Sequence, residues 1–220
     1  MAEDPDAERP TPMQVRRTEQ TDRKWNCIVE NLDSADRNLL DIGCDAGVLT
    51  RRAAETGRPA LGVDRYERYE GAREHAFEAA ERTDGLAFMQ LGLTPENAGT
   101  LPPFDAVVCL SVYHYWHREF GRDGAETMLG AFAGANKVFF SASSLSERYV
   151  QGATPDVVEP AFESRDRESV VSYHEDVLRS ALGESYSVEL LDTVEYSIAD
   201  VAQVPGYETE PRYVLLASRS

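Results

Sequence analysis

Two acidic residues and two glycines, placed at the ends of two predicted strands, carry the clearest chemistry in the sequence. Residues 39–47 read LLDIGCDAG, which predicts a buried strand that runs into a glycine-containing turn. Gly43 allows the backbone to turn tightly and to approach a ligand, and Gly47 allows the next helix to start against the strand. Asp41 directs a carboxylate toward the end of this strand. A second strand ends in Asp64, which lies 21 residues after Gly43.

The spacing of these residues discriminates between two kinds of nucleotide ligand. A dinucleotide-binding loop uses three glycines as G-x-G-x-x-G to bring a pyrophosphate onto a helix N-terminus. Here the spacing is Gly-x-x-x-Gly, and the carboxylates of Asp41 and Asp45 would repel a pyrophosphate. They would attract the ammonium and sulfonium groups of S-adenosylmethionine. Asp64 is placed to accept hydrogen bonds from both hydroxyls of a ribose.

The elements that must position this loop alternate between strands and helices. Apolar runs predict strands at 39–42, 60–64, 86–91, 104–110, 137–141, 187–191 and 213–217. Helical periodicity predicts helices near 25–32, 48–55, 69–80, 128–132 and 177–182, the last with Ser172 and Glu175 as a capping box. Such alternation gives a Rossmann-like α/β fold: a doubly wound, seven-stranded, mostly parallel sheet with helices on both faces. The last two strands have no helix between them, which predicts that one of them runs antiparallel.

These segments together resemble the class I S-adenosylmethionine-dependent methyltransferases. The resemblance rests on residues 39–47, on Gly62-Val63-Asp64 and on the strand at 104–108, and it covers residues 25 to 218. In that family the loop after the first strand holds the methionine part of the cofactor, the acid matching Asp64 holds the ribose, and the loop after the third strand holds adenine. The resemblance implies S-adenosylmethionine as cofactor and the following binding residues: Asp41, Gly43, Cys44, Gly47, Asp64, Arg65, Leu93, Thr94, Leu110 and Ser111, to which a narrower resemblance adds Lys24.

The sequence departs from the family pattern at two places. Asp45 stands where the family usually has a middle glycine, and residues 91–94 read LGLT where many members carry Gly-Asp. Without the second carboxylate, adenine would be held by backbone groups and by the Thr94 hydroxyl. These departures motivate an alternative in which the protein is a cofactor-binding pseudo-enzyme or regulator.

A narrower resemblance concerns the branch that alkylates the wobble uridine of tRNA from carboxy-S-adenosylmethionine. It rests on residues 22–25 (DRKW), 91–96 (LGLTPE) and 110–114 (LSVYH). In that branch the lysine matching Lys24 helps to hold the carboxylate of the cofactor, but Glu19 stands where the branch has a tryptophan. We interpret this as a likeness of the fold, not of the substrate. The other interpretation of Lys24 is a surface lysine beside a buried Trp25.

The segment after the fourth predicted strand is the predicted place of the chemistry. Methyl transfer is an in-line displacement, so positioning supplies most of the rate, and a base is needed only if the acceptor must lose a proton. Tyr113, Tyr115 and Trp116 are expected to wall the transfer site, where aromatic faces favour a sulfonium. His114 is the predicted base or acceptor-orienting residue, with Tyr113 as the second catalytic candidate. Alternatively, His114 packs near adenine and Trp116 covers the following helix.

Histidine spacing does not predict a metal site. His114-x-x-His117 with Glu119 has no evident third or fourth ligand. His75 and His174 are expected at solvated positions on helices.

The charge of the chain is unusual. The 39 acidic residues outnumber the 22 basic ones, which gives a net charge of −17, and Lys24 and Lys137 are the two lysines. Because the acids are scattered along the chain, we interpret them as an adaptation to high intracellular salt, in which counterions screen the repulsion. The alternative is a basic partner. The acidity also argues against nonspecific binding to nucleic acids.

Length and composition predict one cytoplasmic domain over residues 14–220, preceded by a disordered acidic tail at 1–13. The stretch 142–166 is predicted to be a lid or acceptor loop, or else a disordered segment. No apolar run is long enough for a membrane helix, the acidic N-terminus is unlike a signal peptide, and the three cysteines form no disulfide framework. We expect a monomer or weak homodimer that acts on a small molecule. RNA or tRNA is the alternative acceptor, which a basic patch of Arg16, Arg17, Arg23, Arg51 and Arg52 would support.

Overall fold

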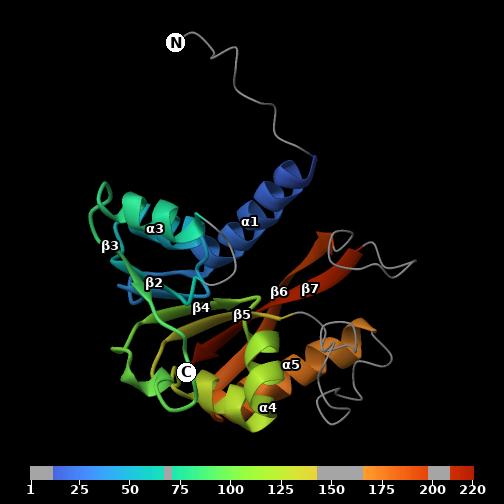
Figure 1. The fold of residues 1–220 in the computed structure, drawn as a ribbon. Helices are drawn as coiled ribbons and strands as arrows, with labels where there is room; N and C mark the ends of the chain where they lie inside the picture. Colours follow the sequence, from blue (N-terminus) through green and yellow to red (C-terminus); the bar gives the residue numbers. More distant parts are fainter. Residues whose placement is uncertain (1–11, 67–70, 143–165, 198–208) are drawn as a thin grey trace.

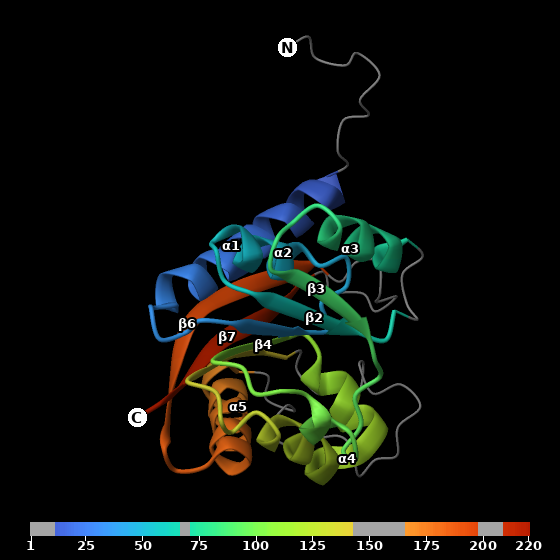
Figure 2. The same cartoon turned by 90° about the vertical axis from the view of Figure 1, so that its left-hand side faces the viewer.

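The chain folds into one central sheet between two layers of helices (Figures 1 and 2). The computed structural model describes residues 12–66, 71–142, 166–197 and 209–220. The strands are β1 (Leu39–Ile42), β2 (Ala60–Asp64), β3 (Leu86–Gln90), β4 (Ala106–Leu110), β5 (Lys137–Ser141), β6 (Tyr186–Ser197) and β7 (Thr209–Arg219). The helices are α1 (Pro12–Asn31), α2 (Val48–Glu55), α3 (Ala72–Ala80), α4 (Tyr113–Gly130) and α5 (Arg167–Leu182), with a short 3-10 turn η1 (Ala98–Thr100).

The topology of the sheet confirms the predicted fold class. The strand order is β3-β2-β1-β4-β5-β7-β6, with β7 antiparallel to both of its neighbours and parallel pairing among the first five strands. The chain leaves β1 toward β2 and β3 and later returns to β4 on the other side of β1. In an open sheet of this kind, ligands bind outside the carboxyl ends of the strands at such a switch point, here between β1 and β4.

Two hydrophobic cores cover the two faces of the sheet. Helices α1, α2 and α3 lie on one face, and α4 and α5 lie on the other (Figures 1 and 2). The core under α1 and α2, called here the α1 core, contains Ile28 and Phe139. The core under α4 and α5, called here the α4 core, contains Tyr113 and Phe140. Strand β4 is buried along its whole length, as its continuous apolar sequence predicts for a central parallel strand.

The starts of two helices, α5 and α1, differ from the sequence-based expectation. Helix α5 begins at Arg167, and the Asp166 side chain caps it by accepting a 2.8 Å hydrogen bond from the backbone N–H of Ser169. The predicted capping box at Ser172 and Glu175 is therefore wrong. Helix α1 begins at Pro12, so the last two residues of the predicted tail, Pro12 and Met13, are helical; residues 1–11 lie outside the described part. Most of the predicted acceptor loop, at 143–165, also lies outside it.

No helix in the described ranges is both long and apolar enough to cross a membrane.

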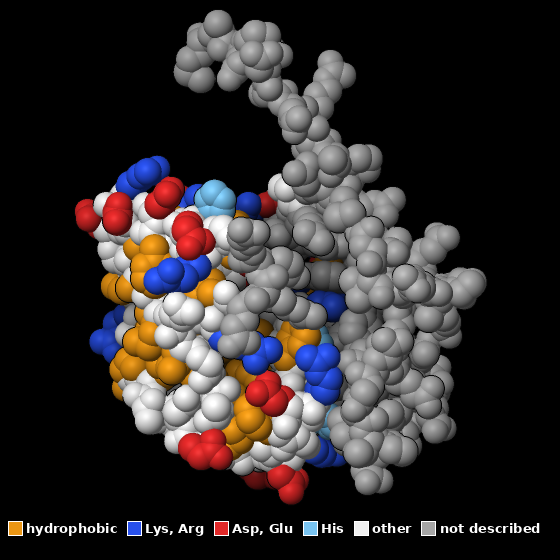
Figure 3. All heavy atoms as spheres, in the orientation of Figure 1, with side chains coloured by type: hydrophobic (Ala, Val, Ile, Leu, Met, Phe, Trp, Pro, Cys, Tyr) orange, Lys and Arg blue, Asp and Glu red, His pale blue; other side chains and the backbone are white. Residues whose placement is uncertain are grey.

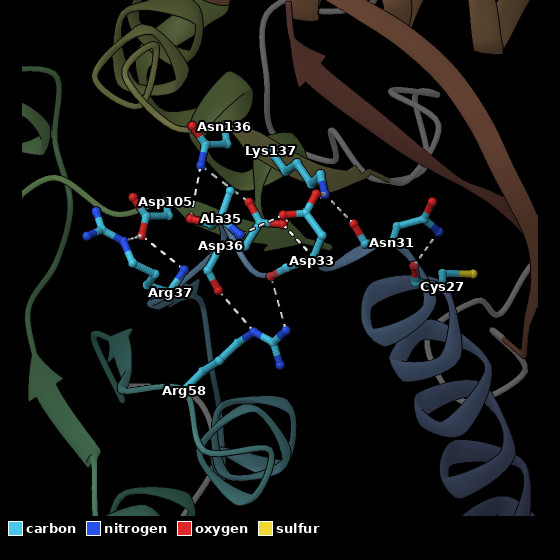
Figure 4. A network of polar contacts seen from close by, with 10 residues as sticks. All are labelled: Cys27, Asn31, Asp33, Ala35, Asp36, Arg37, Arg58, Asp105, Asn136 and Lys137. Carbon is cyan, nitrogen blue, oxygen red and sulfur yellow. Dashed lines mark hydrogen bonds and ion pairs between the residues drawn. The ribbon is translucent and has the colours of Figure 1, made fainter.

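A polar network joins the amino ends of β1, β4 and β5 on the side of the sheet opposite the switch point (Figure 4). Lys137 Nζ donates to Asn31 O at 2.7 Å, to Asp33 Oδ2 at 2.7 Å and to Asp36 Oδ2 at 2.8 Å. The Asp36 side chain is wholly buried, and that of Lys137 is 15% exposed. The lysine therefore neutralises a buried acid and fixes the connection between α1 and β1 to the start of β5.

We predict that Lys137→Met lowers the free energy of unfolding by about 3 kcal/mol, because it leaves Asp36 buried without its cation. Urea denaturation would measure the loss. Arg37→Met is the matched control: Arg37 pairs with Asp105 at 3.2 Å, but its side chain is 79% exposed, and such surface pairs contribute less than about 1 kcal/mol. Equal losses in the two variants would contradict the role given to Lys137.

Candidate functional site

The turn after β1 is held in a shape that ordinary side chains rarely allow. Gly43, Asp45 and Gly47 all adopt left-handed conformations, with φ of 69°, 49° and 74°. The Gly43 N–H donates to Val63 O at 2.8 Å, and the Gly47 N–H donates to Cys44 O at 2.8 Å. Aspartate tolerates this region better than most residues, and the Asp45 side chain is exposed. The missing middle glycine therefore leaves the turn intact.

Three glycines allow close approach around this turn. A Cβ added at Gly43 would lie 2.4 Å from Val112 Cγ2, and one at Gly47 would lie 2.3 Å from Phe88 Cζ. A Cβ at Gly62 would also lie 2.5 Å from the Phe88 ring. The ring of Phe88, on β3, thus lies against both the turn and β2. Sequence reasoning missed this residue, because only the pairing of β2 with β3 brings it to the turn.

Asp64 joins the turns that follow β1 and β2. Its Oδ2 accepts from the Asp45 N–H at 3.0 Å, and its Oδ1 accepts from the Tyr66 N–H at 2.8 Å. A carboxylate has about four lone-pair sites, so each oxygen retains a site for a further donor. The carboxylate at the end of β2 therefore braces the turns and can still accept hydroxyl groups from a ligand.

Asp41 lies beneath the turn and is buried. Thr50 Oγ1, on α2, donates to Asp41 Oδ2 at 2.6 Å. Burial raises the pKa of Asp41 to about 7, although the hydrogen bonds from Thr50 and the charge of Lys24 oppose this shift. The negative charge at this position therefore depends on pH near neutrality and on cations close by.

Lys24 is not the surface lysine that one interpretation expected. Its side chain is 6% exposed, on the face of α1 that meets the sheet, whereas Trp25 is only half-buried. The effect of Lys24 on the pKa of Asp41 places the two charges in the same region.

The described arginines of the basic patch that would support RNA binding form ion pairs with acidic side chains. Arg23 pairs with Asp192 at 2.6 Å, Arg51 pairs with Glu55, and Arg52 pairs with Asp22. The side chains of Arg16 and Arg17 lie outside the described residues. Acidic and basic side chains also intermingle over the described part of the face in Figure 3. These ion pairs do not favour an RNA-binding surface.

Two side chains with polar ends line the turn on the β2 side. Cys44 Sγ lies 3.3 Å from Tyr66 Oη, and the Tyr66 ring meets the ring of Phe77 edge to face at 6.2 Å. Burial raises the pKa of Cys44 and of Tyr66 above their ordinary values, so both stay protonated at neutral pH. The predicted site residue Cys44 thus forms part of a neutral wall, together with Tyr66.

The loop after β3 is braced by an asparagine. Asn97 Oδ1 accepts from the Thr94 N–H at 2.8 Å, and Asn97 Nδ2 donates to Gly92 O at 2.9 Å. Leu93, which lies between Gly92 and Thr94 in the sequence, is buried. A hydrogen bond from the Thr94 side chain lowers the pKa of Glu96, so this hydroxyl is engaged within the loop. Asn97 gave no recognisable signal in the sequence.

The remaining predicted binding residues lie around the ends of β2 and β4. Arg65 is exposed and pairs with Glu119 of α4 at 3.3 Å. Leu110 is buried, and Ser111 follows it with a left-handed φ of 66°. Ser111 Oγ accepts from Arg212 at 2.7 Å, a contact between β7 and the end of β4 that sequence reasoning did not foresee.

The aromatic segment after β4 is more buried than expected. Helix α4 starts at Tyr113, and both Tyr113 and Trp116 belong to the α4 core, with Tyr113 0% exposed. The expectation that these two residues wall an open transfer site is therefore wrong, because the helical start turns them inward. His114 is buried, with its ring centroid 4.2 Å from that of the half-buried Tyr115.

The other histidines divide between core and surface. His75 is exposed, as expected, but His174 is wholly buried, and burial lowers its pKa to about 3. The expectation of a solvated His174 is wrong, because α5 packs this side of the helix on β5 through Phe140. His117 is buried next to Tyr113. Within the described ranges, no three His, Cys, Asp or Glu side chains are grouped to hold a metal ion.

Relatives with known names match part of the chain. The ubiquinone biosynthesis O-methyltransferase of Aromatoleum aromaticum is 32% identical over 89 residues, which is 40% of this chain and 37% of that protein. The protein of the same name from Vibrio campbellii is 32% identical over 97 residues, or 42% of this chain and 39% of the relative. The matches thus span less than two fifths of the length of these relatives. No family model matches the chain.

Solved structures match nearly the whole chain. Magnesium protoporphyrin IX methyltransferase (ChlM) from Synechocystis PCC 6803, with bound SAM, superposes with a TM-score of 0.57 at 19% identity, over 94% of this chain and 81% of that one. The bifunctional kinase-methyltransferase WbdD gives 0.59 at 20% identity, over 92% of this chain and 39% of that one. At such identities the likeness concerns the fold. The strand order and these superpositions show a fold shared with the methyltransferases named here, and the sequence resembles the O-methyltransferases of ubiquinone biosynthesis over about two fifths of this chain.

Proposed function

We propose that the protein binds S-adenosylmethionine at the carboxyl ends of β1 and β2 and transfers its methyl group to a small-molecule acceptor. One observation carries the proposal. The Asp64 carboxylate braces a turn with three left-handed residues, and each of its oxygens retains a lone-pair site for a further donor. This is the position at which a ribose is held in sheets of this type.

The residues of the site fit this cofactor. Gly43, Gly47 and Gly62 leave no room for a Cβ, because Val112 and Phe88 pack directly against the backbone there and fix the shape of the turn. Asp41 and Asp64 supply negative charge beside a ligand whose sulfonium and ammonium are positive. When bound, S-adenosylmethionine supplies an activated methyl group, and the task of the protein is to orient it and to exclude water.

Individual residues have distinct proposed roles. Asp64 binds the ribose hydroxyls, and Asp41 stabilises positive charge above the turn. Lys24 is proposed to hold the methionine carboxylate, since it is a buried cation in the same region as Asp41. Leu93 and Leu110, both buried, are proposed to border adenine together with the backbone of the Asn97-braced loop.

The acceptor is proposed to be a small molecule. The relatives reported above are named as O-methyltransferases of ubiquinone biosynthesis, and ChlM is named as a methyltransferase of magnesium protoporphyrin IX. The ion pairs that neutralise Arg23, Arg51 and Arg52 give RNA no comparable support. A pseudo-enzyme is also not favoured, because Asp45 keeps the turn in shape and its side chain is exposed. Salt adaptation, a cytoplasmic location and the monomeric or weakly dimeric state stay predictions from the sequence.

We predict that Asp64→Asn weakens the binding of S-adenosylhomocysteine at least about tenfold, because hydrogen bonds to a charged acceptor contribute about 1.5–3 kcal/mol. Isothermal titration calorimetry would measure the dissociation constants. Asp84→Asn is the control, since it removes the same charge from an exposed turn before β3. If the wild type does not bind the nucleoside, or if both variants bind equally well, the proposed site is wrong.

The pKa of Asp41 predicts how affinity depends on pH. As the pH rises through about 7, Asp41 loses its proton and gains a negative charge. S-Adenosylmethionine carries a sulfonium and S-adenosylhomocysteine a neutral thioether. The ratio of their affinities is therefore expected to shift toward S-adenosylmethionine by about fivefold between pH 6 and 8. This is the size of the Coulomb attraction between the Asp41 carboxylate and a sulfonium several ångströms away at an intermediate dielectric constant. Asp41→Asn, which still accepts from Thr50, is expected to flatten this dependence, and an unchanged slope in the variant would exclude Asp41.

His114 is proposed as the base or orienting group for the acceptor, because it is a buried imidazole at the start of α4. His114→Ala is expected to lower turnover about 100-fold, the contribution typical of a positioned base, with S-adenosylhomocysteine affinity within twofold of wild type. The assay is transfer of a labelled methyl group to a panel of small phenols and carboxylic acids. His75→Ala, at an exposed position, is the control. Full turnover in His114→Ala removes His114 from the mechanism.

A further inference from the structure

Two polar side chains, Ser141 and Arg212, lie on the same face of the sheet near the carboxyl ends of β4 and β5. Residues two apart on a strand point to the same face. Leu110 on β4 belongs to the α1 core, and so does Phe139 on β5, which places Ser141 on the same side. On β7, Leu216 belongs to the α1 core, so Arg212 also points to this face. Ser141 and Arg212 thus lie on the face that carries Asp41 and Lys24.

Arg212 reaches across the end of β5. Its guanidinium, in a residue that is 7% exposed, donates to Ser111 Oγ at 2.7 Å. Ser111 follows β4, and β5 lies between β4 and β7 in the sheet. Since neighbouring strands lie about 4.8 Å apart, this side chain spans two strand spacings and passes over the end of the strand that bears Ser141.

Among the described side chains, Arg212, Ser111 and Ser141 offer hydrogen-bond donors there. Arginine has five N–H donors and no acceptor. Because Ser111 Oγ accepts from Arg212, the proton of its own hydroxyl is directed elsewhere. Ser141 Oγ is wholly buried and has no hydrogen-bond partner among the described residues. The Ser111 N–H donates to Ser141 O at 2.6 Å, which holds the two serines side by side.

A guanidinium and two hydroxyl donors in one buried place match a planar or tetrahedral oxyanion. The proposed binding site of the methyl donor, S-adenosylmethionine, has the opposite charge, since Asp41 and Asp64 are carboxylates. Lys24 is the buried cation that lies in the region of Asp41, on β1, whereas Arg212 is on β7, beyond β4 and β5. Arg212 is therefore a second buried cation, separated in the fold from the one proposed for the methionine carboxylate.

We propose that Arg212, Ser111 and Ser141 form a binding site for an oxyanion group, a carboxylate or a phosphate, of the methyl acceptor. As an acceptor site it rests on the proposed methyltransferase function. It adds to that function a chemical class of substrate: a small acidic molecule, bound by its anionic group while another of its atoms faces the methyl donor. Arg212 and the two serines act by positioning this substrate, not as catalytic residues.

The test compares charged and neutral probes of the same shape. The dissociation constants of benzoate, benzamide and phenyl phosphate would be measured by ligand-observed NMR at pH 7.5 and fixed ionic strength. Each is measured with and without saturating S-adenosylhomocysteine, so that the anion preference is read even if the nucleoside does not bind. We expect benzoate or phenyl phosphate to bind at least tenfold tighter than benzamide, and the tighter of the two anions identifies the class.

Variants assign the preference to Arg212. Arg212→Gln is expected to abolish the preference for the anion, Arg212→Lys to keep part of it, and Ser141→Ala to weaken the anion twofold to fivefold. Arg219→Gln is the matched control, since it removes an exposed arginine from the same strand, one that bonds to Gly134 O. Thermal unfolding of each variant shows whether it is folded, and if Arg212→Gln is not, the Lys and Ser141→Ala variants carry the test.

Each outcome decides between the two proposals. Equal binding of benzoate and benzamide to the wild type, no binding of any probe, or a preference that survives in Arg212→Gln overturns the oxyanion site. So does a loss of S-adenosylhomocysteine affinity in Arg212→Gln, because the arginine would then serve the methionine carboxylate of the donor. An anion preference without nucleoside binding supports the oxyanion site but overturns the proposed function.

Discussion

The carboxylate of Asp64 is the constraint on which the site depends. It accepts one backbone N–H from the turn after β1 and one from the turn after β2, so the two strand ends present a single rigid edge. Backbone hydrogen bonds from Gly43 to Val63 O and from Gly47 to Cys44 O hold the left-handed residues of the turn as well. The glycines then matter because Phe88 and Val112 occupy the space where their Cβ atoms would be. A carboxylate and two apolar side chains thus shape the turn after β1 in the absence of a ligand.

The sheet and its first turn were largely predictable from the sequence, for a physical reason. Strands β1, β2 and β5 were predicted with their observed bounds, because buried parallel strands are short continuous apolar runs. The turn was predictable because glycine, followed by Asn and Asp, adopts the left-handed conformation most readily. Asp45 shows how far this reasoning holds, because it adopts a left-handed φ of 49° at a position where a glycine was expected.

The remainder could not be predicted because it depends on contacts between distant parts of the chain. His174 has the sequence surroundings of a solvated helix position, and only the packing of α5 on Phe140 buries it. Tyr113 was misplaced because the start of α4 carries no typical cap: the residue before it, Val112, makes no side-chain capping bond. Arg212 meets Ser111 across an intervening strand, which follows from the strand order and from no local pattern. Such features are set by topology.

The proposed oxyanion site has to be reconciled with a net charge of −17. At low ionic strength the field of the whole protein opposes the approach of an anionic acceptor and slows its association. At 1 M salt the Debye length is about 3 Å, so this field no longer reaches the acceptor in solution, while a buried guanidinium in contact with its ligand is screened much less. Lys24 and Arg212 are buried on the same face of the sheet, so positive charge is concentrated where it is shielded from solvent. An acidic surface and an anion-binding interior are therefore compatible in one molecule, and most readily so in concentrated salt.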